Sequence, residues 1–333
     1  MKTLAFISLS VTLCGCVLIS PGYGAEKVYP FKFAHAQPLT HPRHKSMEFF
    51  KQKVEEASHG RIPVEIFGAG ILGNEFALLD MVKIGTMQGM RGGLFERVNR
   101  KYLLFTLPFL LNDYEQAKRV IRSPVADKVN MEARNNGFYV PATCLVGGFR
   151  QYTNRVRPIK TPDDMRGLKM RTPAIDTILR TMSALGASPQ QVPYTETYMA
   201  LRTGVVDGEE NPYSNIVEMK FYEVQKYLTV VNSNVNPDPF VVNLQWYEGL
   251  PDDLKKHFDS AARAAMIYSD QIWLDSEETY RQFLQKKLET NVLSEESRKL
   301  FSDRVKSVWQ YYVQQGYFTA AEIDEVLSIA KGK

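Results

Sequence analysis

The amino-acid sequence predicts an α/β protein of two lobes joined by a crossing segment and a long helix. Strand-like and helix-like stretches alternate in the first part of the 333 residues, which implies a parallel sheet covered by helices. The same alternation begins again after residue 160. Residues 252–290 contain neither glycine nor proline, so one long helix is expected to brace both lobes.

The first lobe begins with a strand, a helix, a strand and a helix. Residues 31–34 alternate like a half-buried strand, and residues 64–67 form a second one. Between them Thr40 can cap a helix whose apolar residues recur at helical spacing. After the second strand, Asn74 caps a helix that ends at Gly85.

A glycine-rich segment, GTMQGMRGG at 85–93, follows where a strand should emerge into a loop. Glycines there let the backbone approach a ligand or leave room where a side chain would stand. A flexible turn is the alternative. Residues 103–111 are too apolar for the surface and indicate core or lobe interface. Helices are then expected at 114–122 and 124–135, before a buried strand at 139–146.

In the second lobe, a capping threonine, a proline and two acids at 161–164 mark a helix start. The polar segment 233–239 indicates a return crossing between the lobes. The other expected elements are a strand at 168–171, a helix at 174–185, an extended piece up to 193, a helix at 195–203, a strand at 205–207, a helix opening at 211–212, strands at 227–232 and 240–246, the long helix at 251–290, a helix at 294–315 and a final helix from the capping box at 319–322.

The first 25 residues have the pattern of a secretory signal peptide. Lys2 precedes an apolar run, and a small-x-small triplet at 22–24 comes before Ala25. The run is too short and too poorly flanked for a membrane anchor, so we expect cleavage near Ala25 and export. The alternative is lipid anchoring at Cys16, but the residue two positions before it, Cys14, would normally be small.

The composition of the chain excludes several classes of protein. Without the leader, Cys144 is the only cysteine, so no internal disulfide is expected and the core must hold the fold unaided. The net charge of +4 is spread along the chain rather than gathered in blocks, which argues against a nucleic-acid partner. No second apolar run has the length of a membrane span. We expect an exported, soluble protein.

Neither a catalytic nor a metal site is expected. The five histidines fit no common zinc spacing, and the sequence has no G-x-S-x-G elbow, P-loop or dinucleotide motif. Cys144 lies in an apolar strand pattern, so we interpret it as an inert core thiol. Because no nucleophile is paired with a base, we expect a protein that is not an enzyme and needs no cofactor.

A pair of arginines suggests a carboxylate clamp. Arg150 and Arg171 each end a short run in the stretch 147–173, and we expect them to project from neighbouring strand ends in one lobe. Arginine is suited to this role because its planar fork donates two parallel hydrogen bonds to a carboxylate. Surface salt bridges, for example to Asp163 or Asp164, are the alternative.

Two further residues lie near this stretch in the predicted topology. Asn211 precedes a proline and is a good helix cap, although an amide can cap and still contact a ligand. Tyr194 follows Pro193 at a strand end, where it lines either a pocket or the core.

Long ordered segments of the chain resemble a known family. They are FAHAQPLTHPRH, LGNE, LPFLL, FRQYTNRVRPIKTPDDMRGLKMRTP, ALGASPQQVPYTETYMALRTGVVDGEENP and FYEVQKYL. The chain resembles the periplasmic solute-binding subunits of TRAP transporters, the tripartite ATP-independent carriers, in the C4-dicarboxylate-binding-like branch.

The resemblance implies a periplasmic solute-binding protein fold, with two α/β lobes around a cleft, linked by crossing strands and a long helix. We expect one lobe from 26–148 plus 237–275 and the other from 149–236 plus 276–333. The implied function is capture of a small organic acid by lobe closure and delivery to a membrane permease, with the protein acting as a monomer.

The resemblance also implies roles for single residues. Arg171 would form the salt bridge with the ligand carboxylate, Arg150 would support it, and Asn211 would add polar contacts. By the same resemblance, Tyr194 would line the pocket, and Glu75 and His35 would face it from the other lobe.

The sequence departs from the family pattern at GMRGG, residues 89–93. Fewer side chains there would enlarge the cavity, and Arg91 could add a third positive group, so the ligand need not be a four-carbon dicarboxylate. Sugar acids, keto or hydroxy acids, aromatic acids and dicarboxylates remain open. A periplasmic enzyme acting on an organic acid and a ligand sensor for a signalling partner are the alternative functions.

Overall fold

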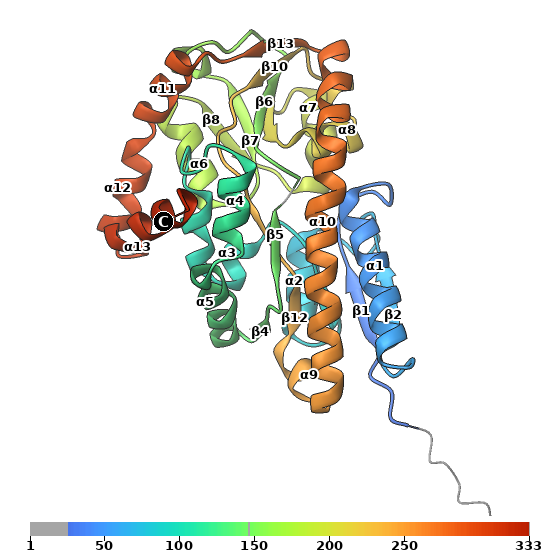
Figure 1. The fold of residues 1–333 in the computed structure, drawn as a ribbon. Coiled ribbons are helices and arrows are strands. Elements are labelled where there is room, and N and C mark those ends of the chain that lie inside the picture. The colour runs from blue at the N-terminus through green and yellow to red at the C-terminus, as the bar shows by residue number, and fades with distance from the viewer. Residues whose placement is uncertain (1–25, 146, 333) are drawn as a thin grey trace, which may run out of the picture.

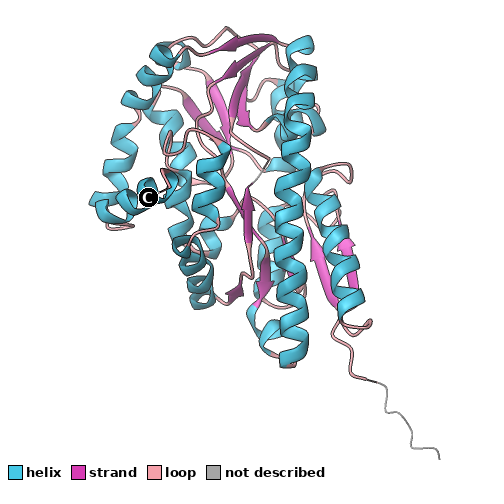
Figure 2. Ribbon diagram, in the orientation of Figure 1, coloured by secondary structure: helices cyan, strands magenta, loops and turns pink. Residues whose placement is uncertain are grey.

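The structure, a computed structural model, describes residues 26–145 and 147–332; the predicted signal peptide, 1–25, lies outside them. Strands form a five-stranded, a six-stranded and a two-stranded sheet. The six-stranded sheet lies in the upper half of Figure 1, the five-stranded sheet in the lower half and strand β5 between them. Helices surround both larger sheets (Figure 2). The predicted α/β fold of two lobes is confirmed.

The first lobe is built around strand β1 (Phe31–Ala34). It pairs in parallel with β2 (Val64–Phe67) on one side and β3 (Gly89–Met90) on the other. Helices α1 (Pro42–Ala57) and α2 (Glu75–Lys83) make the connections. This is the predicted alternation of strand and helix, which forces each strand to return in the same direction.

Antiparallel strands complete the first sheet, because β12 (Val241–Asn243) pairs with β3 and with β4 (Phe138–Tyr139). The core beside it is aromatic. The ring of Phe31 lies 5.6 Å from that of Phe50 and 5.1 Å from that of Phe258, and all three side chains are buried. Burial of each such ring stabilises the lobe by about 1.5–3 kcal/mol.

The second lobe contains the six-stranded sheet, in the order β13-β10-β6-β9-β7-β8. Strand β9 is parallel to β7 and antiparallel to β6, so the expected adjacency of the two arginine-bearing strands is wrong. The start of β6 and the end of β7 nevertheless lie at the same end of the sheet. The strands are β6 (Gln151–Asn154), β7 (Lys169–Thr172), β8 (Ser188–Gln191), β9 (Gly208–Asn211), β10 (Tyr227–Val230) and β13 (Glu289–Val292).

Strand β9 lies later in the chain than the sequence pattern predicted. The apolar residues at 205–206 favoured a strand at 205–207, whereas the paired residues are GEEN at 208–211. Glu209 and Glu210 are buried in β9 because hydrogen-bond donors from neighbouring residues satisfy them. Hydrophobicity alone gives no signal for such a strand.

Two crossing strands and one helix connect the lobes. Strands β5 (Thr143–Leu145) and β11 (Pro237–Pro239) pair antiparallel, so the return crossing is confirmed, while the strand predicted at 139–146 divides into β4 and β5. Helix α10 (Asp252–Lys287) is 36 residues long and packs against α1 in one lobe and α8 (Tyr213–Glu218) in the other. The predicted bracing helix is confirmed.

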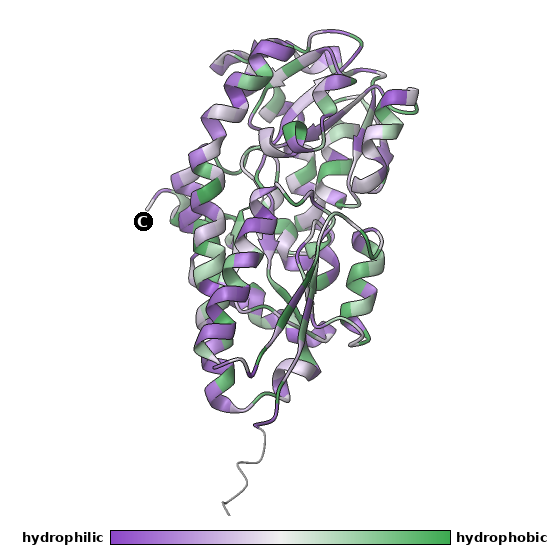
Figure 3. Ribbon diagram, turned by 90° about the vertical axis from the view of Figure 1, so that its right-hand side faces the viewer, coloured by the Kyte–Doolittle hydropathy of each residue, from purple (hydrophilic) through white to green (hydrophobic). Residues whose placement is uncertain are grey.

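The remaining helices cover the outside of the sheets. Figure 3 shows hydrophilic and hydrophobic residues mixed along the helices, as expected where one face is buried. Among the described residues, no helix combines the length and apolar character needed to cross a membrane. The helices not yet named are α3 (Phe95–Val98), α4 (Tyr114–Ile121), α5 (Pro124–Glu132), α6 (Asp176–Ala184), α7 (Thr197–Thr203), α9 (Leu244–Glu248), α11 (Glu295–Arg304), α12 (Lys306–Gln314) and α13 (Ala320–Ala330).

Other boundaries also differ from the prediction. His41, not Thr40, caps α1, because its ring accepts a hydrogen bond from the Arg43 amide. The strand expected at 240–246 ends early, since the Asn243 side chain caps α9. The helix expected at 294–315 is interrupted at Val305.

We propose that the lobes divide as predicted, into 26–148 plus 237–275 and 149–236 plus 276–333. Strand membership supports this division, since each of the larger sheets takes its strands from one set. The C-terminal helix α13 packs back against α4 of the first lobe, so the second set also contributes to the outer surface of the first.

Candidate functional site

A cavity of about 170 Å³ lies between the two lobes. This volume is several times the roughly 30 Å³ that one water molecule occupies in the liquid, so the cavity can admit a small organic molecule. Glu75, Phe76 and Leu94 line it from the first lobe. The lining from the second lobe consists of Arg171, Pro173, Ala174, Gln191, Val192, Pro193 and Tyr194.

Arg171 is the cation of this cavity. It lies on β7, is only 2 % exposed, and donates from Nε to the Val192 carbonyl at 2.9 Å. No carboxylate of the described residues makes an ion pair with it, and burial, with Arg150 nearby, lowers the pKa of its guanidinium. A buried charge without a counter-ion is costly. The side chain is therefore placed to gain from an anion in the cavity.

Arg150, by contrast, already has a counter-ion. It lies just before β6 and forms a bidentate ion pair with Glu210, with 2.7 Å between Nη2 and Oε1. Nη2 also donates to the Asn211 side-chain oxygen at 3.2 Å. Burial alone would lower the pKa of Arg150, but Glu210 raises it above its ordinary value. Arg150 does not line the cavity.

Asn211 ends strand β9 and belongs to the same polar network. Its side-chain oxygen also accepts from Asn215, at 2.8 Å, and its nitrogen donates to Glu209 at 2.5 Å. The side chain does not cap a helix, because α8 begins after Pro212 and has no side-chain cap. Burial raises the pKa of Glu209 to about 7.

Tyr194 and Glu75 both line the cavity, from opposite lobes. The Tyr194 hydroxyl is buried without a hydrogen-bond partner in the described chain, and the ring lies 5.9 Å from the Arg171 guanidinium. Glu75 Oε1 accepts from the Gly93 amide at 3.0 Å. A Cβ on Gly92 would approach that same oxygen to 3.0 Å, so the glycine-rich segment provides space for the Glu75 carboxylate.

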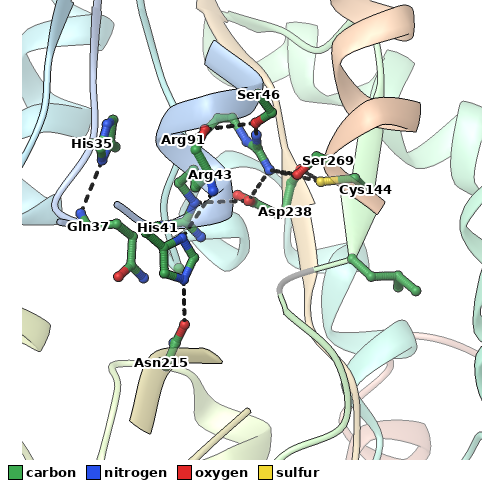
Figure 4. Close-up of polar contacts among 12 residues, drawn as sticks. His35, Gln37, His41, Arg43, Ser46, Arg91, Cys144, Asn215, Asp238 and Ser269 are labelled. Carbon is green, nitrogen blue, oxygen red and sulfur yellow. Dashed lines mark hydrogen bonds and ion pairs between the residues drawn. The ribbon is translucent and has the colours of Figure 1, made fainter. Parts of the chain in front are cut away.

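His35 and Arg91 lie away from the cavity lining. The rings of His35 and His44 are hydrogen bonded at 2.9 Å, and burial lowers the pKa of His35 to about 2. Arg91 forms an ion pair with Asp238 at 2.5 Å and also bonds to Ser46 (Figure 4). Since Asp238 balances its charge, Arg91 does not supply the third free positive group that the sequence suggested.

Sequence reasoning missed Arg43. Its Nε donates to Asp238 at 3.0 Å and its Nη1 lies 3.9 Å from Glu75, so it lies directly behind the cavity wall. Nη1 is buried without a hydrogen-bond partner in the described residues. One signal was available: Arg43 is in the first turn of α1, where the helix dipole disfavours a cation, so a specific partner was to be expected.

The two lobes touch where α1 begins. The His41 ring is hydrogen bonded to the Asn215 side chain at 3.1 Å (Figure 4), and Thr40 donates to Glu218. Each contact joins the first turn region of α1 to α8 in the other lobe. The structure therefore has the lobes closed against each other at this edge.

A family model for bacterial extracellular solute-binding proteins, family 7, matches residues 33–315. The chain belongs to this family. It is 28 % identical over 294 residues to a C4-dicarboxylate-binding periplasmic protein, DctP, of Vibrio cholerae, covering 84 % of this chain and 85 % of the relative. The two-lobe fold and solute-binding class implied by the sequence resemblance are thus confirmed.

Solved structures show the same fold. A sugar acid binding protein of Advenella mimigardefordensis, in complex with galactonate, is 27 % identical with a TM-score of 0.87, covering 92 % of this chain and 99 % of that one. A TRAP periplasmic solute binding protein of Shewanella oneidensis, with bound succinate, is 26 % identical with a TM-score of 0.85, covering 91 % and 99 %.

Proposed function

We propose that the protein captures a small organic acid between its lobes in the periplasm and delivers it to the membrane permease of a TRAP transporter. The observation that carries this proposal is Arg171, whose buried guanidinium lines the cavity without a counter-ion. The galactonate and succinate bound by the two similar proteins support it, since both are carboxylates.

Each polar residue of the site then has a role in the proposal. Arg171 binds the carboxylate. The Arg150–Glu210 ion pair and Asn211 hold the end of β9, the strand that pairs with the Arg171 strand β7. Tyr194 and Glu75 close the cavity from opposite lobes. Closure removes water, which strengthens the ion pair because the local dielectric constant falls. His35 and Arg91 act behind the first-lobe wall, without touching the ligand.

The protein acts as a monomeric binding protein and not as an enzyme in this proposal. No lining residue of the cavity pairs a nucleophile with a base, and no group of three or more metal-ligating side chains occurs among the described residues. A bound acid should accordingly be recovered chemically unchanged, which mass spectrometry of the protein-bound fraction measures.

Replacement of Arg171 by Ala tests the proposal. We expect ligand affinity to fall by about 2–5 kcal/mol, roughly thirty-fold or more, because a desolvated carboxylate loses its partner. Isothermal titration with acids that stabilise the parent in a thermal-shift screen measures this. Arg166→Ala is the matched control, since Arg166 is exposed in the same stretch and its loss should leave affinity unchanged. Equal affinity of the parent and the Arg171 variant would reject the clamp.

A further inference from the structure

The cavity presents one cation and one anion, each from a different lobe. Arg171 belongs to the second lobe and Glu75 to the first, and both line the cavity. They influence each other electrostatically, yet no ion pair joins them within 4.0 Å. A ligand between them therefore meets groups of opposite charge.

The Arg171 side accepts an anion. Nε is occupied by the Val192 carbonyl, whereas the two terminal nitrogens make no hydrogen bond with the described residues. Arginine can only donate, and one N–H from each terminal nitrogen can point at one of the two oxygens of a carboxylate. One carboxylate is therefore expected here.

The Glu75 side favours a hydrogen-bond donor. Oε1 accepts from the Gly93 amide at 3.0 Å, while Oε2 accepts no hydrogen bond from the described residues. A carboxylate can only accept, so a ligand hydroxyl would satisfy it and a second ligand carboxylate would be repelled.

Arg43 does not reverse this preference. It lies behind Glu75, 3.9 Å from Oε1, and is itself shared with Asp238. Its free Nη1 is buried rather than part of the cavity lining. In the first lobe, Asp238 and Glu75 equal Arg43 and Arg91 in number of charges. Of these four groups only Glu75 lines the cavity, so a second carboxylate would meet its oxygens rather than a cation.

Most of the remaining wall is apolar. Gln191 and Tyr194 are the other polar side chains in it. A ligand carrying a hydroxyl on every carbon would leave several of them against hydrocarbon, which is unfavourable. The apolar lining consists of Phe76, Leu94, Pro173, Ala174, Val192 and Pro193.

We infer from this lining that the ligand is a hydroxy monocarboxylate with a partly apolar skeleton, its carboxylate on Arg171 and a hydroxyl donated to Glu75. The inference rests on the proposed function and specifies the class of acid. A dicarboxylate is selected against by Glu75, and a fully hydroxylated acid by the apolar wall.

Matched sets of acids test this inference by isothermal titration at neutral pH. At each length from four to six carbons, a diacid is compared with the hydroxy acid in which CH2OH replaces one carboxyl, and with the fully hydroxylated acid. Mass spectrometry of the co-purified ligand counts its carboxyl and hydroxyl groups. We expect the hydroxy acid to bind about ten-fold or more tightly than its diacid, about 1.4 kcal/mol.

The Glu75→Gln variant should reverse or abolish the preference, because an amide can donate to a second carboxylate. The matched control is Asp80→Asn, on the exposed face of the same helix, where the preference should persist. The native comparison remains decisive even if the Glu75 variant is unstable.

The possible failures are distinguishable. If the diacid binds the parent as tightly as the hydroxy acid, or if the co-purified ligand carries two carboxylates, the ligand class is wrong while acid capture stands. An unaltered preference in Glu75→Gln removes the role of Glu75. If no acid binds and the co-purified ligand lacks a carboxyl group, the proposed function itself fails.

Discussion

Charge compensation distinguishes Arg171 from the other buried arginines. Glu210 balances Arg150, and Asp238 lies between Arg43 and Arg91. The sequence identified Arg171 and Arg150 as a pair but could not show which one is already neutralised, because the partner of Arg150 is 60 residues away. The same reason explains Arg91, whose partner is 147 residues away.

Asp238→Asn should be strongly destabilising. It leaves two buried arginines without their shared anion, which costs about 3–5 kcal/mol. Urea denaturation measures the free energy of unfolding. Asp324→Asn serves as the control, because Asp324 is exposed on α13 and such substitutions usually change stability by about 0.5 kcal/mol or less. Similar stability of both variants would contradict the role of Asp238.

At the scale of single elements, capping residues predicted helices better than hydrophobicity predicted strands. Asn74 and Thr319 cap helices as expected, because a side-chain cap acts within three residues. The strand predictions were wrong where the stability of a strand depends on partners far away in the sequence. Strand β9 consists of a glycine, two glutamates and an asparagine, all buried, so only the neighbouring strands explain it.

Loss of the cap of α2 should affect both stability and binding. Asn74 accepts from the amides of Phe76 and Ala77, and Asn74→Ala is expected to cost about 1 kcal/mol. Because the same turn presents Glu75 to the cavity, ligand affinity should also fall. Thermal unfolding and titration measure the two effects.

Thr319→Ala provides the matched control, since it removes the capping box of α13 far along the chain from the cavity residues. A similar loss of stability with unchanged affinity is expected. If both variants bind equally well, the first turn of α2 does not position Glu75.

For the whole molecule, the architecture was predictable and the contacts between lobes were not. Repeated strand–helix alternation and the long uninterrupted α10 indicated two lobes and their connection. The bond between His41 and Asn215 joins residues 174 apart, and no local pattern marks it. Closure of the lobes thus depends on pairs that only the folded chain brings together.

Buried histidines should make stability depend on pH. Burial lowers the pKa of His35 to about 2 and that of His41 to about 3, from 6.5. Both rings are neutral when folded, so their contribution is fully present above about pH 6.5 and is lost as pH falls towards 3. Burial raises the pKa of Glu209 and Glu277 to about 7, so their contribution is lost in the opposite direction, as pH rises from 4.5.

The His41→Asn variant separates these effects. Below about pH 6.5, the stability of the parent relative to the variant should fall by up to about 1.4 kcal/mol per pH unit, as measured by urea denaturation across pH. His257→Asn, at an exposed position of α10, is the matched control for replacing a histidine by asparagine, and the two variants are compared at each pH. A difference for His41 that is constant across pH would contradict a neutral buried ring.

The burial of Cys144 has a practical consequence for spectroscopy of lobe motion. Cys144 lies on the crossing strand β5, which packs against α10. Its thiol is fully buried, and burial raises its pKa to about 12. It is therefore protonated and shielded from alkylating dyes at neutral pH. Cysteines introduced at exposed positions, one in each lobe, should take up fluorophores selectively. Energy transfer between such labels can follow closure while Cys144 is left in place.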